Sequence, residues 1–146
     1  MLKNKKAIEI YTDGSEKGSY GSWAFVMVQN GKVLTEGFGR EKKTTSYRME
    51  FQAAIEALKI LPQSSKVTLY TDCRILVDTM TLWSKGWKAN GWIKAKGQKI
   101  PNVDIIIALD YLSQNHKITW KWVKAHSGKT HNERADELCL NAREQL

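Results

Sequence analysis

Four carboxylate residues stand where strands and helices are expected to meet, and together they could bind a cation. Asp13 and Asp72 each end an identical tripeptide, Tyr-Thr-Asp, at residues 11–13 and 70–72. Each tripeptide closes an apolar stretch typical of a β-strand. Ligands of open α/β sheets bind beyond the carboxyl ends of parallel strands, so the two Asp side chains are expected to lie side by side. Either Asp alone could equally begin a turn.

Glu50 and Asp136 extend this acidic set from two predicted helices. Glu50 shares a helical stripe with Ala and Leu residues, and an unpaired charge on a buried face costs several kcal/mol. An ion pair with Arg48 or Lys43 would offset that cost, and so would a metal ion. Asp136 is expected in the first turn of the last helix, where the helix dipole would also favour it. Four carboxylates without a Cys/His cluster favour a hard cation such as Mg²⁺.

One histidine is placed for proton transfer. His126 lies in the small, polar stretch 124–130, where a histidine could exchange protons near neutral pH. An ordinary exposed loop histidine is the alternative. His126 and His131 are spaced H-x4-H, but the chain has no C-x-x-C motif and Cys73 stands alone, so structural zinc is not expected.

The elements that would position these groups alternate along the chain. Residues 7–40 predict a three-stranded antiparallel meander, with Asn30-Gly31 as a hairpin turn. A helix that contains Glu50 then ends before Pro62. The later elements are a strand at 67–72, helices at 75–82 and 103–112, a strand at 118–123 and a C-terminal helix. This β-β-β-α-β-α-α-β-α order predicts an α/β fold with a five-stranded mixed sheet and helices on both faces.

Composition limits the function classes. The 146 residues suit one domain, and 42% hydrophobic residues argue against wholesale disorder. The net charge of +8 favours a polyanionic partner, with nucleic acid before a membrane surface. The longest apolar run, residues 23–28, is too short to span a membrane. Two scattered cysteines predict a reducing, cytoplasmic compartment.

The positive charge is concentrated in one stretch. Residues 79–103 contain no Asp or Glu, and they carry five lysines and three of the six tryptophans. These lysines could neutralise phosphates of a nucleic acid, or they could simply be solvated while the tryptophans pack the stretch onto the body.

Together these features resemble ribonuclease H type 1, the cellular form with a basic protrusion. The resemblance covers essentially the whole chain. It rests on residues 11–15 (Tyr-Thr-Asp-Gly-Ser), 47–50 (Tyr-Arg-Met-Glu), 70–72, 123–128 (Val-Lys-Ala-His-Ser-Gly) and 132–136 (Asn-Glu-Arg-Ala-Asp). It implies an RNase H-like fold and an endoribonuclease that hydrolyses the RNA strand of RNA/DNA hybrids, leaving 5′-phosphate and 3′-hydroxyl ends.

The resemblance also implies site residues. Asp13, Glu50, Asp72 and Asp136 would hold two Mg²⁺ ions, with Mn²⁺ a possible substitute, and His126 would assist proton transfer or product release. Residues 83–100 would form a substrate-binding handle. The implied substrate-binding residues are Gly14, Ser15, Lys43, Thr45, Ser46, Tyr47, Arg74, Trp83, Lys85, Trp87, Lys88, Lys94, Lys96 and Asn132.

Three of those positions depart from the family pattern. Ser46 and Tyr47 stand where Asn or Gln is common, and Arg74 stands where Gln is frequent. Tyr47 could stack on a base or sugar, and Arg74 could contact a phosphate or a base edge. Other interpretations are a non-catalytic hybrid-binding module, an integrase, transposase or resolvase of the same fold, and the RNase H domain of a reverse transcriptase. The start at Met1 and the absence of a linker favour a free-standing protein, expected to be a monomer.

Overall fold

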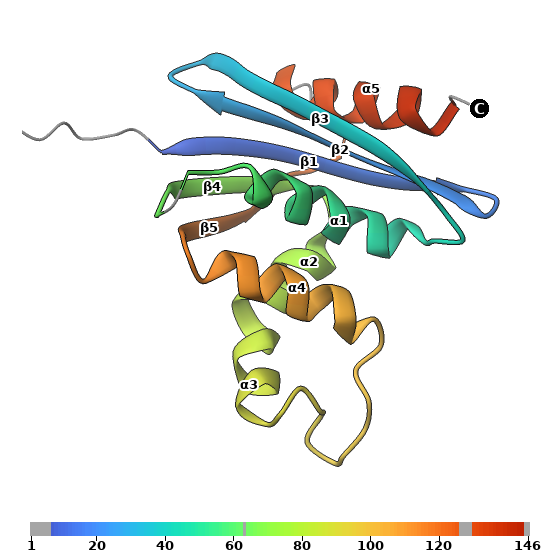
Figure 1. The fold of residues 1–146 in the computed structure, drawn as a ribbon, viewed down its shortest axis with the longest axis vertical. Helices are drawn as coiled ribbons and strands as arrows, with labels where there is room; N and C mark the ends of the chain where they lie inside the picture. Colours follow the sequence, from blue (N-terminus) through green and yellow to red (C-terminus); the bar gives the residue numbers. More distant parts are fainter. Residues whose placement is uncertain (1–6, 63, 126–129, 145–146) are drawn as a thin grey trace, which may run out of the picture.

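The computed structural model describes residues 7–62, 64–125 and 130–144, and it forms a five-stranded mixed sheet in the order β3-β2-β1-β4-β5 (Figure 1). The strands are β1 (Ile8–Lys17), β2 (Tyr20–Gln29), β3 (Lys32–Lys42), β4 (Lys66–Thr71) and β5 (Lys117–Trp122). β1, β2 and β3 pair antiparallel, whereas β4 runs parallel to both β1 and β5. The predicted fold class, meander and parallel central pair are confirmed.

Helices lie on both faces of the sheet, and one helical segment extends away from it. They are α1 (Ser46–Lys59), α2 (Arg74–Asp78), η1 (Thr79–Trp83), α3 (Ser84–Ala89), α4 (Val103–Ser113) and α5 (Thr130–Glu144). α1 packs on one face with α4 beside it, and α5 covers the other face across β1, β2 and β3 (Figure 1). No helix within the described residues is long and apolar enough to cross a membrane.

Alternation along the strands builds two cores. Ile10 faces the larger core with Phe51 of α1 and Leu109 of α4, while its neighbour Tyr11 faces the smaller core with Leu138 of α5. The apolar face of the C-terminal helix is therefore buried, as the sequence predicts.

The helix predicted at 75–82 is longer and less regular than expected. Helical backbone runs from Arg74 to Ala89 as α2, the π-helical η1 and α3. Gly86 lies inside α3 and does not end the helix. The apolar periodicity used for the prediction fades where the segment leaves the body. Figure 1 shows α3 and the loop after it extending away from the sheet, beyond α4.

The position of Asp136 also differs from the prediction. α5 begins at Thr130, so Asp136 lies beyond the first turn, and Glu133 is the acidic residue of that turn. The residues 130–133 are polar and lack the apolar stripe that begins at Ala135, which is why the sequence pattern places the helix start too late.

Candidate active site

The two Tyr-Thr-Asp tripeptides bring their Asp residues to one edge of the sheet. β1 and β4 are parallel, and Tyr11 is the register partner of Tyr70. Asp13 and Asp72 therefore sit at equivalent positions two residues further along. Asp72 directly follows the end of β4, whereas β1 continues past Asp13 to Lys17, so the expectation that the first tripeptide closes its strand is wrong. Glu50 reaches the same place from α1, and one carboxylate oxygen from each of the three residues lies within 4.8 Å of the others.

The approach of α1 to β1 depends on Gly14. A Cβ atom at this position would lie 2.4 Å from the backbone N of Glu50 and 2.4 Å from the backbone C of Met49. No side chain fits in that space, so glycine permits the contact that sets Glu50 beside Asp13. The start of α1 is fixed by its N-cap Thr45, whose Oγ1 accepts the backbone N–H of Arg48 at 3.2 Å.

Asp136 joins the three other carboxylates from α5. Its side chain hydrogen-bonds with that of Asp13. Asp13, Asp72 and Asp136 also line one cavity of about 380 Å³, together with Ser15, Leu140 and Arg143. The structure therefore brings together all four carboxylates named from the sequence.

Mutual repulsion and burial raise the proton affinity of this cluster. Burial and the neighbouring carboxylates, Asp136 foremost, raise the pKa of Asp13 to about 8. The same causes, with burial largest, hold the pKa of Glu50 well above its usual range, although the Gly14 backbone opposes the shift. Glu50 Oε1 is buried and has no hydrogen-bond partner. A buried Glu50 oxygen without a hydrogen-bond partner, set among other carboxylates, suits a hard divalent cation, so the residues present fit Mg²⁺.

The proposed ion pair of Arg48 with Glu50 is wrong. The Arg48 guanidinium instead makes a two-pronged contact with Asp104 at 2.8 and 3.0 Å, and also donates to Asn102. This pairing ties α1 to the first turn of α4, on the surface. It leaves the acidic cluster to be neutralised by something other than Arg48.

The residues around α1 lie in varied settings. Lys43 is exposed with a left-handed backbone (φ 52°), and Ser46 donates its backbone N–H to Glu16. Tyr47 packs against the larger core with its ring 4.9 Å from that of Phe51. A half-buried ring in this setting is less available for stacking on a base than the sequence suggests.

Of two further residues that the resemblance implies, His126 and Asn132, the structure describes only Asn132. His126 lies outside the described residues. Asn132 is only 1% exposed, and its Nδ2 is buried without a hydrogen-bond partner. A contact between this side chain and a substrate backbone would need the Asn132 amide to become accessible.

Residues 83–100, the predicted handle, pack partly against the larger core and partly extend away from the body (Figure 1). Trp87 and Trp92 are half-buried against the larger core, whereas Trp83 is 41% exposed with its ring 5.9 Å from that of Trp87. Lys88 is paired with Asp110 of α4 at 3.2 Å. The remaining predicted contact lysines of this segment are Lys85, Lys94 and Lys96.

Sequence reasoning named Arg74 but missed Trp122 and Arg143 at this edge. The Trp122 indole N–H donates to the backbone oxygen of Asp72 at 3.1 Å, and the Arg74 guanidinium lies over the Trp122 ring, 4.6 Å from its centroid. Arg74 is thus held next to the acidic edge. Arg143, which lines the cavity, follows Asp136 by seven residues, a spacing that predicts the same helix face.

Comparison with known proteins identifies the family. The RNase H family model matches residues 5–144. The chain belongs to the RNase H family. It is 42% identical over 148 residues to the Ribonuclease H of Francisella tularensis subsp. novicida and to that of Francisella philomiragia, covering 100% of this chain and 97% of each relative. RNase H family membership and the acidic cluster assign ribonuclease H activity on RNA/DNA hybrids, with a metal-binding acidic triad.

Solved structures give the same fold. LC9-RNase H1, described as a type 1 RNase H with the type 2 active-site motif, superposes with a TM-score of 0.83 at 25% identity, over 98% of this chain and 74% of that one. LC11-RNase H1, solved in complex with an RNA/DNA hybrid, has a TM-score of 0.68 at 22% identity, over 92% of this chain and 95% of that one.

Proposed function

We propose that this RNase H is an endoribonuclease that cuts the RNA strand of RNA/DNA hybrids and leaves 5′-phosphate and 3′-hydroxyl ends. Asp13, Glu50, Asp72 and Asp136 would hold two Mg²⁺ ions, with Mn²⁺ as a possible substitute. The observation that carries the proposal is the convergence of carboxylates from β1, α1 and β4 with oxygens within 4.8 Å of one another, one of them a buried Glu50 oxygen without a partner.

Each acidic residue has a distinct place in this proposal. When bound, two metal ions activate the attacking water and stabilise the leaving oxygen of an in-line displacement. Asp13 occupies the centre, because its carboxylate faces both the Glu50–Asp72 side and Asp136. Glu50 reaches the cluster from α1, and the close approach of Gly14 to the α1 backbone fixes its position. His126 would accept or deliver a proton beside the cut.

The duplex would lie across the acidic edge and the handle. Gly14 and Ser15 lie in β1, where Ser15 lines the cavity, and Lys43, Thr45, Ser46 and Tyr47 precede or begin α1. Trp83, with its 41% exposed side chain, and the handle lysines would meet the DNA strand's sugars and phosphates. The position of Arg74 on Trp122 supports a contact with substrate beside Asp72. A monomeric, cytoplasmic enzyme stays a prediction.

The decisive experiment compares one sequence as RNA/DNA hybrid, double-stranded RNA and double-stranded DNA, with and without Mg²⁺. We expect cleavage of only the RNA strand of the hybrid, dependent on Mg²⁺. Asp13→Asn should abolish it, because Asp13 is shared by the proposed metal positions. Asp104→Asn, a surface Asp with a side chain 69% exposed, is the matched control and should retain activity. Equal cutting of duplex DNA, or activity surviving Asp13→Asn, would refute the proposal.

A further inference from the structure

We propose that Arg143 binds a phosphate of the RNA strand adjacent to the scissile phosphate. The inference rests on the proposed function and adds a substrate contact to it from the C-terminal end of α5. It is supported by three observations: the position of Arg143 in the acidic cavity, the partial burial of its side chain, and a buried Nε–H that lacks an acceptor.

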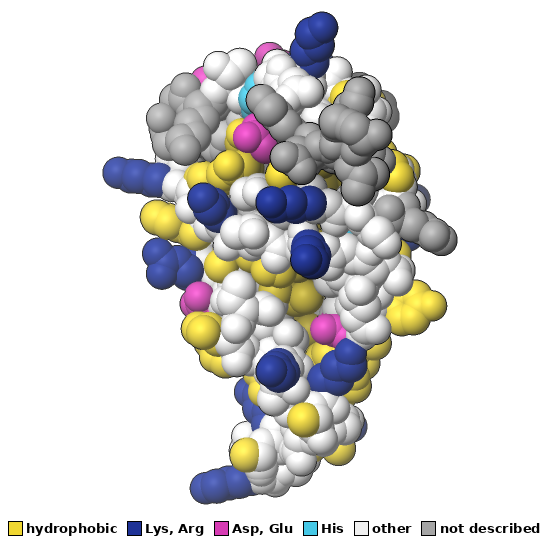
Figure 2. All heavy atoms as spheres, turned by 90° about the vertical axis from the view of Figure 1, so that its left-hand side faces the viewer, with side chains coloured by type: hydrophobic (Ala, Val, Ile, Leu, Met, Phe, Trp, Pro, Cys, Tyr) yellow, Lys and Arg dark blue, Asp and Glu magenta, His cyan; other side chains and the backbone are white. Residues whose placement is uncertain are grey.

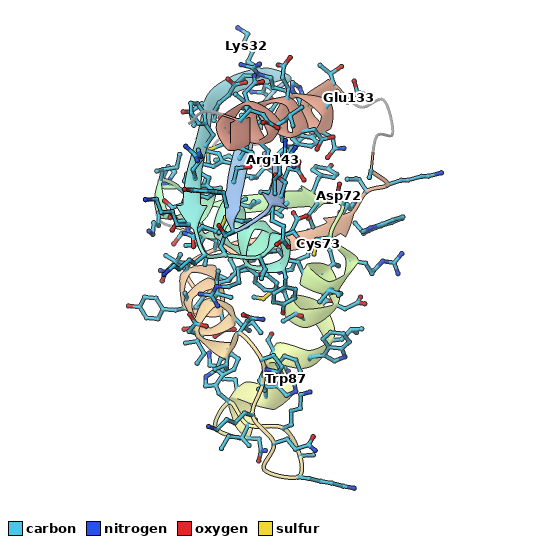
Figure 3. The ribbon with its side chains drawn as sticks, turned by 90° about the vertical axis from the view of Figure 1, so that its right-hand side faces the viewer. Lys32, Asp72, Cys73, Trp87, Glu133 and Arg143 are labelled. Carbon is cyan, nitrogen blue, oxygen red and sulfur yellow. The ribbon has the colours of Figure 1, made fainter. Side chains whose placement is uncertain are left out.

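Arg143 shares a wall of the cavity with a carboxylate. Asp136, Leu140 and Arg143 follow one another at i, i+4 and i+7 along α5, so they form one stripe on the helix. Asp13 and Ser15, alternate residues of β1, line the facing wall. In Figure 3 Arg143 is seen below α5, between this helix and Asp72. The cavity is thus acidic at one end and cationic at the other.

The separation within the stripe selects which phosphate Arg143 meets. Seven residues of α-helix advance roughly 10 Å along the axis, so the backbone of Arg143 lies one phosphate spacing or more beyond that of Asp136 while its side chain still lines the same cavity. A strand whose scissile phosphate sits at the carboxylates would therefore present a neighbouring phosphate to Arg143.

The guanidinium is held in place but is incompletely satisfied. The Arg143 side chain is only 21% exposed, and its Nε is buried without a hydrogen-bond partner. Its Nη2 meets Glu144 Oε1 at a long 3.3 Å, and Glu144 also pairs with Lys17 at 3.6 Å. A buried N–H without an acceptor is costly, and a guanidinium fork matches phosphate oxygens well. A phosphate entering the cavity would supply the missing acceptor.

The structural alternative is that Arg143 merely stabilises the end of α5. A cation in the last turn interacts favourably with the helix dipole, and the ion pair with Glu144 could stabilise the end of the helix. Under this alternative, removing Glu144 should act like removing Arg143. Under the proposal it should not, because Glu144 is half-exposed and does not line the cavity.

The test compares Arg143→Ala, Arg143→Lys and Glu144→Gln. Each is measured for hybrid cleavage with Mg²⁺, for thermal unfolding, and for hybrid binding over a NaCl series in an Asp13→Asn background that prevents cleavage. For Arg143→Ala we expect KM to rise about 5–10-fold with kcat within twofold. The slope of log K against log salt should fall by about one, the loss of one phosphate contact. Arg143→Lys should keep the slope, and Glu144→Gln should match wild type in binding and KM.

Two results would overturn the inference: a salt slope unchanged in Arg143→Ala, or a Glu144→Gln variant that reproduces the KM and slope of Arg143→Ala. Wild-type cleavage in the same assay separates this inference from the proposed function. Failure of the wild type to cut the hybrid overturns the proposed function. Normal wild-type cleavage with an unaffected Arg143→Ala variant overturns the Arg143 contact alone.

Discussion

At the scale of single residues, the acidic cluster trades stability for metal binding. Asp13 and Glu50 are largely buried among other carboxylates, and their raised pKa values mean that the folded protein favours the protonated forms. Ionising them in the folded state without a cation is therefore unfavourable. Divalent metal would reverse this, since opposite charge favours the ionised carboxylates and binding to the folded state stabilises it.

Asp13→Asn should therefore stabilise the metal-free protein at alkaline pH. The pKa of Asp13 is raised to about 8 in the folded state, above its ordinary value of 3.8. A raised carboxyl pKa contributes stability that is complete below about pH 4 and is lost as the pH rises through 8. Removing the charge should raise the free energy of unfolding at pH 8 by about 1–3 kcal/mol.

Urea unfolding in EDTA at pH 5 and pH 8 checks this. The gain from Asp13→Asn should be larger at pH 8 than at pH 5. Added Mg²⁺ should stabilise wild type more than the variant, because the variant has lost one of the proposed metal ligands. An equal gain at both pH values would show that Asp13 carries no such electrostatic strain.

At the scale of elements, the site depends on how closely α1 approaches β1. Gly14→Ala would put a methyl group 2.4 Å from two backbone atoms of α1, and backbone has no rotamer with which to move away. We expect this variant to lose about 2–4 kcal/mol of stability and most of its activity, as Glu50 is displaced.

Gly86→Ala is the matched control for stability. A Cβ at Gly86 meets nothing within 4 Å, and the residue lies inside α3. Alanine favours a helix interior over glycine, so this variant should gain up to about 1 kcal/mol. Urea unfolding of both variants gives the comparison. A tolerated Gly14→Ala would mean that α1 can shift without loss, and that the contact does not fix Glu50.

Much of this arrangement could be predicted from the sequence because it follows from strand order. Identical tripeptides in matching register on two parallel strands place Asp13 beside Asp72, and the helical stripe places Glu50 next to them. The rest depends on tertiary geometry that no local pattern encodes. The sequence does not show which carboxylate pairs with Arg48. The packing of α1 on α4 brings Asp104, rather than Glu50, to the Arg48 guanidinium.

The same limit applies to the helix ends and the cavity wall. The polar start of α5 hides its first turn, so Asp136 was placed too near the helix start. Arg143 could have been found by extending the helix face from Asp136, but its burial in the cavity appears only in the fold. The packing of Tyr47 on Phe51 likewise needs the third dimension.

At the scale of the whole molecule, charge is divided between two regions. The acidic cavity lies beside the carboxyl end of β4 and the middle of β1, whereas residues 79–103 carry five lysines and no acidic residue. Figure 2 shows the face opposite to that of Figure 3, and on it too Lys and Arg side chains are spread from the body down to the tip of the projecting segment. The acid-free segment favours a polyanionic partner, whereas the acidic cavity needs a metal ion before it can accept a phosphate.

This division predicts a salt dependence that belongs to the handle rather than to total charge. Replacing Lys85, Lys94 and Lys96 by Ala should weaken hybrid binding and lower the slope of log K against log salt by about two to three, near one unit per lost phosphate contact. Lys88 is left out because Asp110 already neutralises it. Cleavage at saturating substrate should be retained, since the carboxylates are untouched.

The matched control removes the same charge elsewhere. Lys32, Lys66 and Lys117 are exposed; Lys32 lies at the end of the molecule opposite Trp87 in Figure 3, and Lys66 and Lys117 pair at the amino ends of β4 and β5. If net charge alone attracted the hybrid, both triple variants would lower the slope equally. If the handle grips phosphates, only the first will. An unchanged slope in the handle variant would leave residues 83–100 with a purely structural role, anchored by Trp87 and Trp92 against the core.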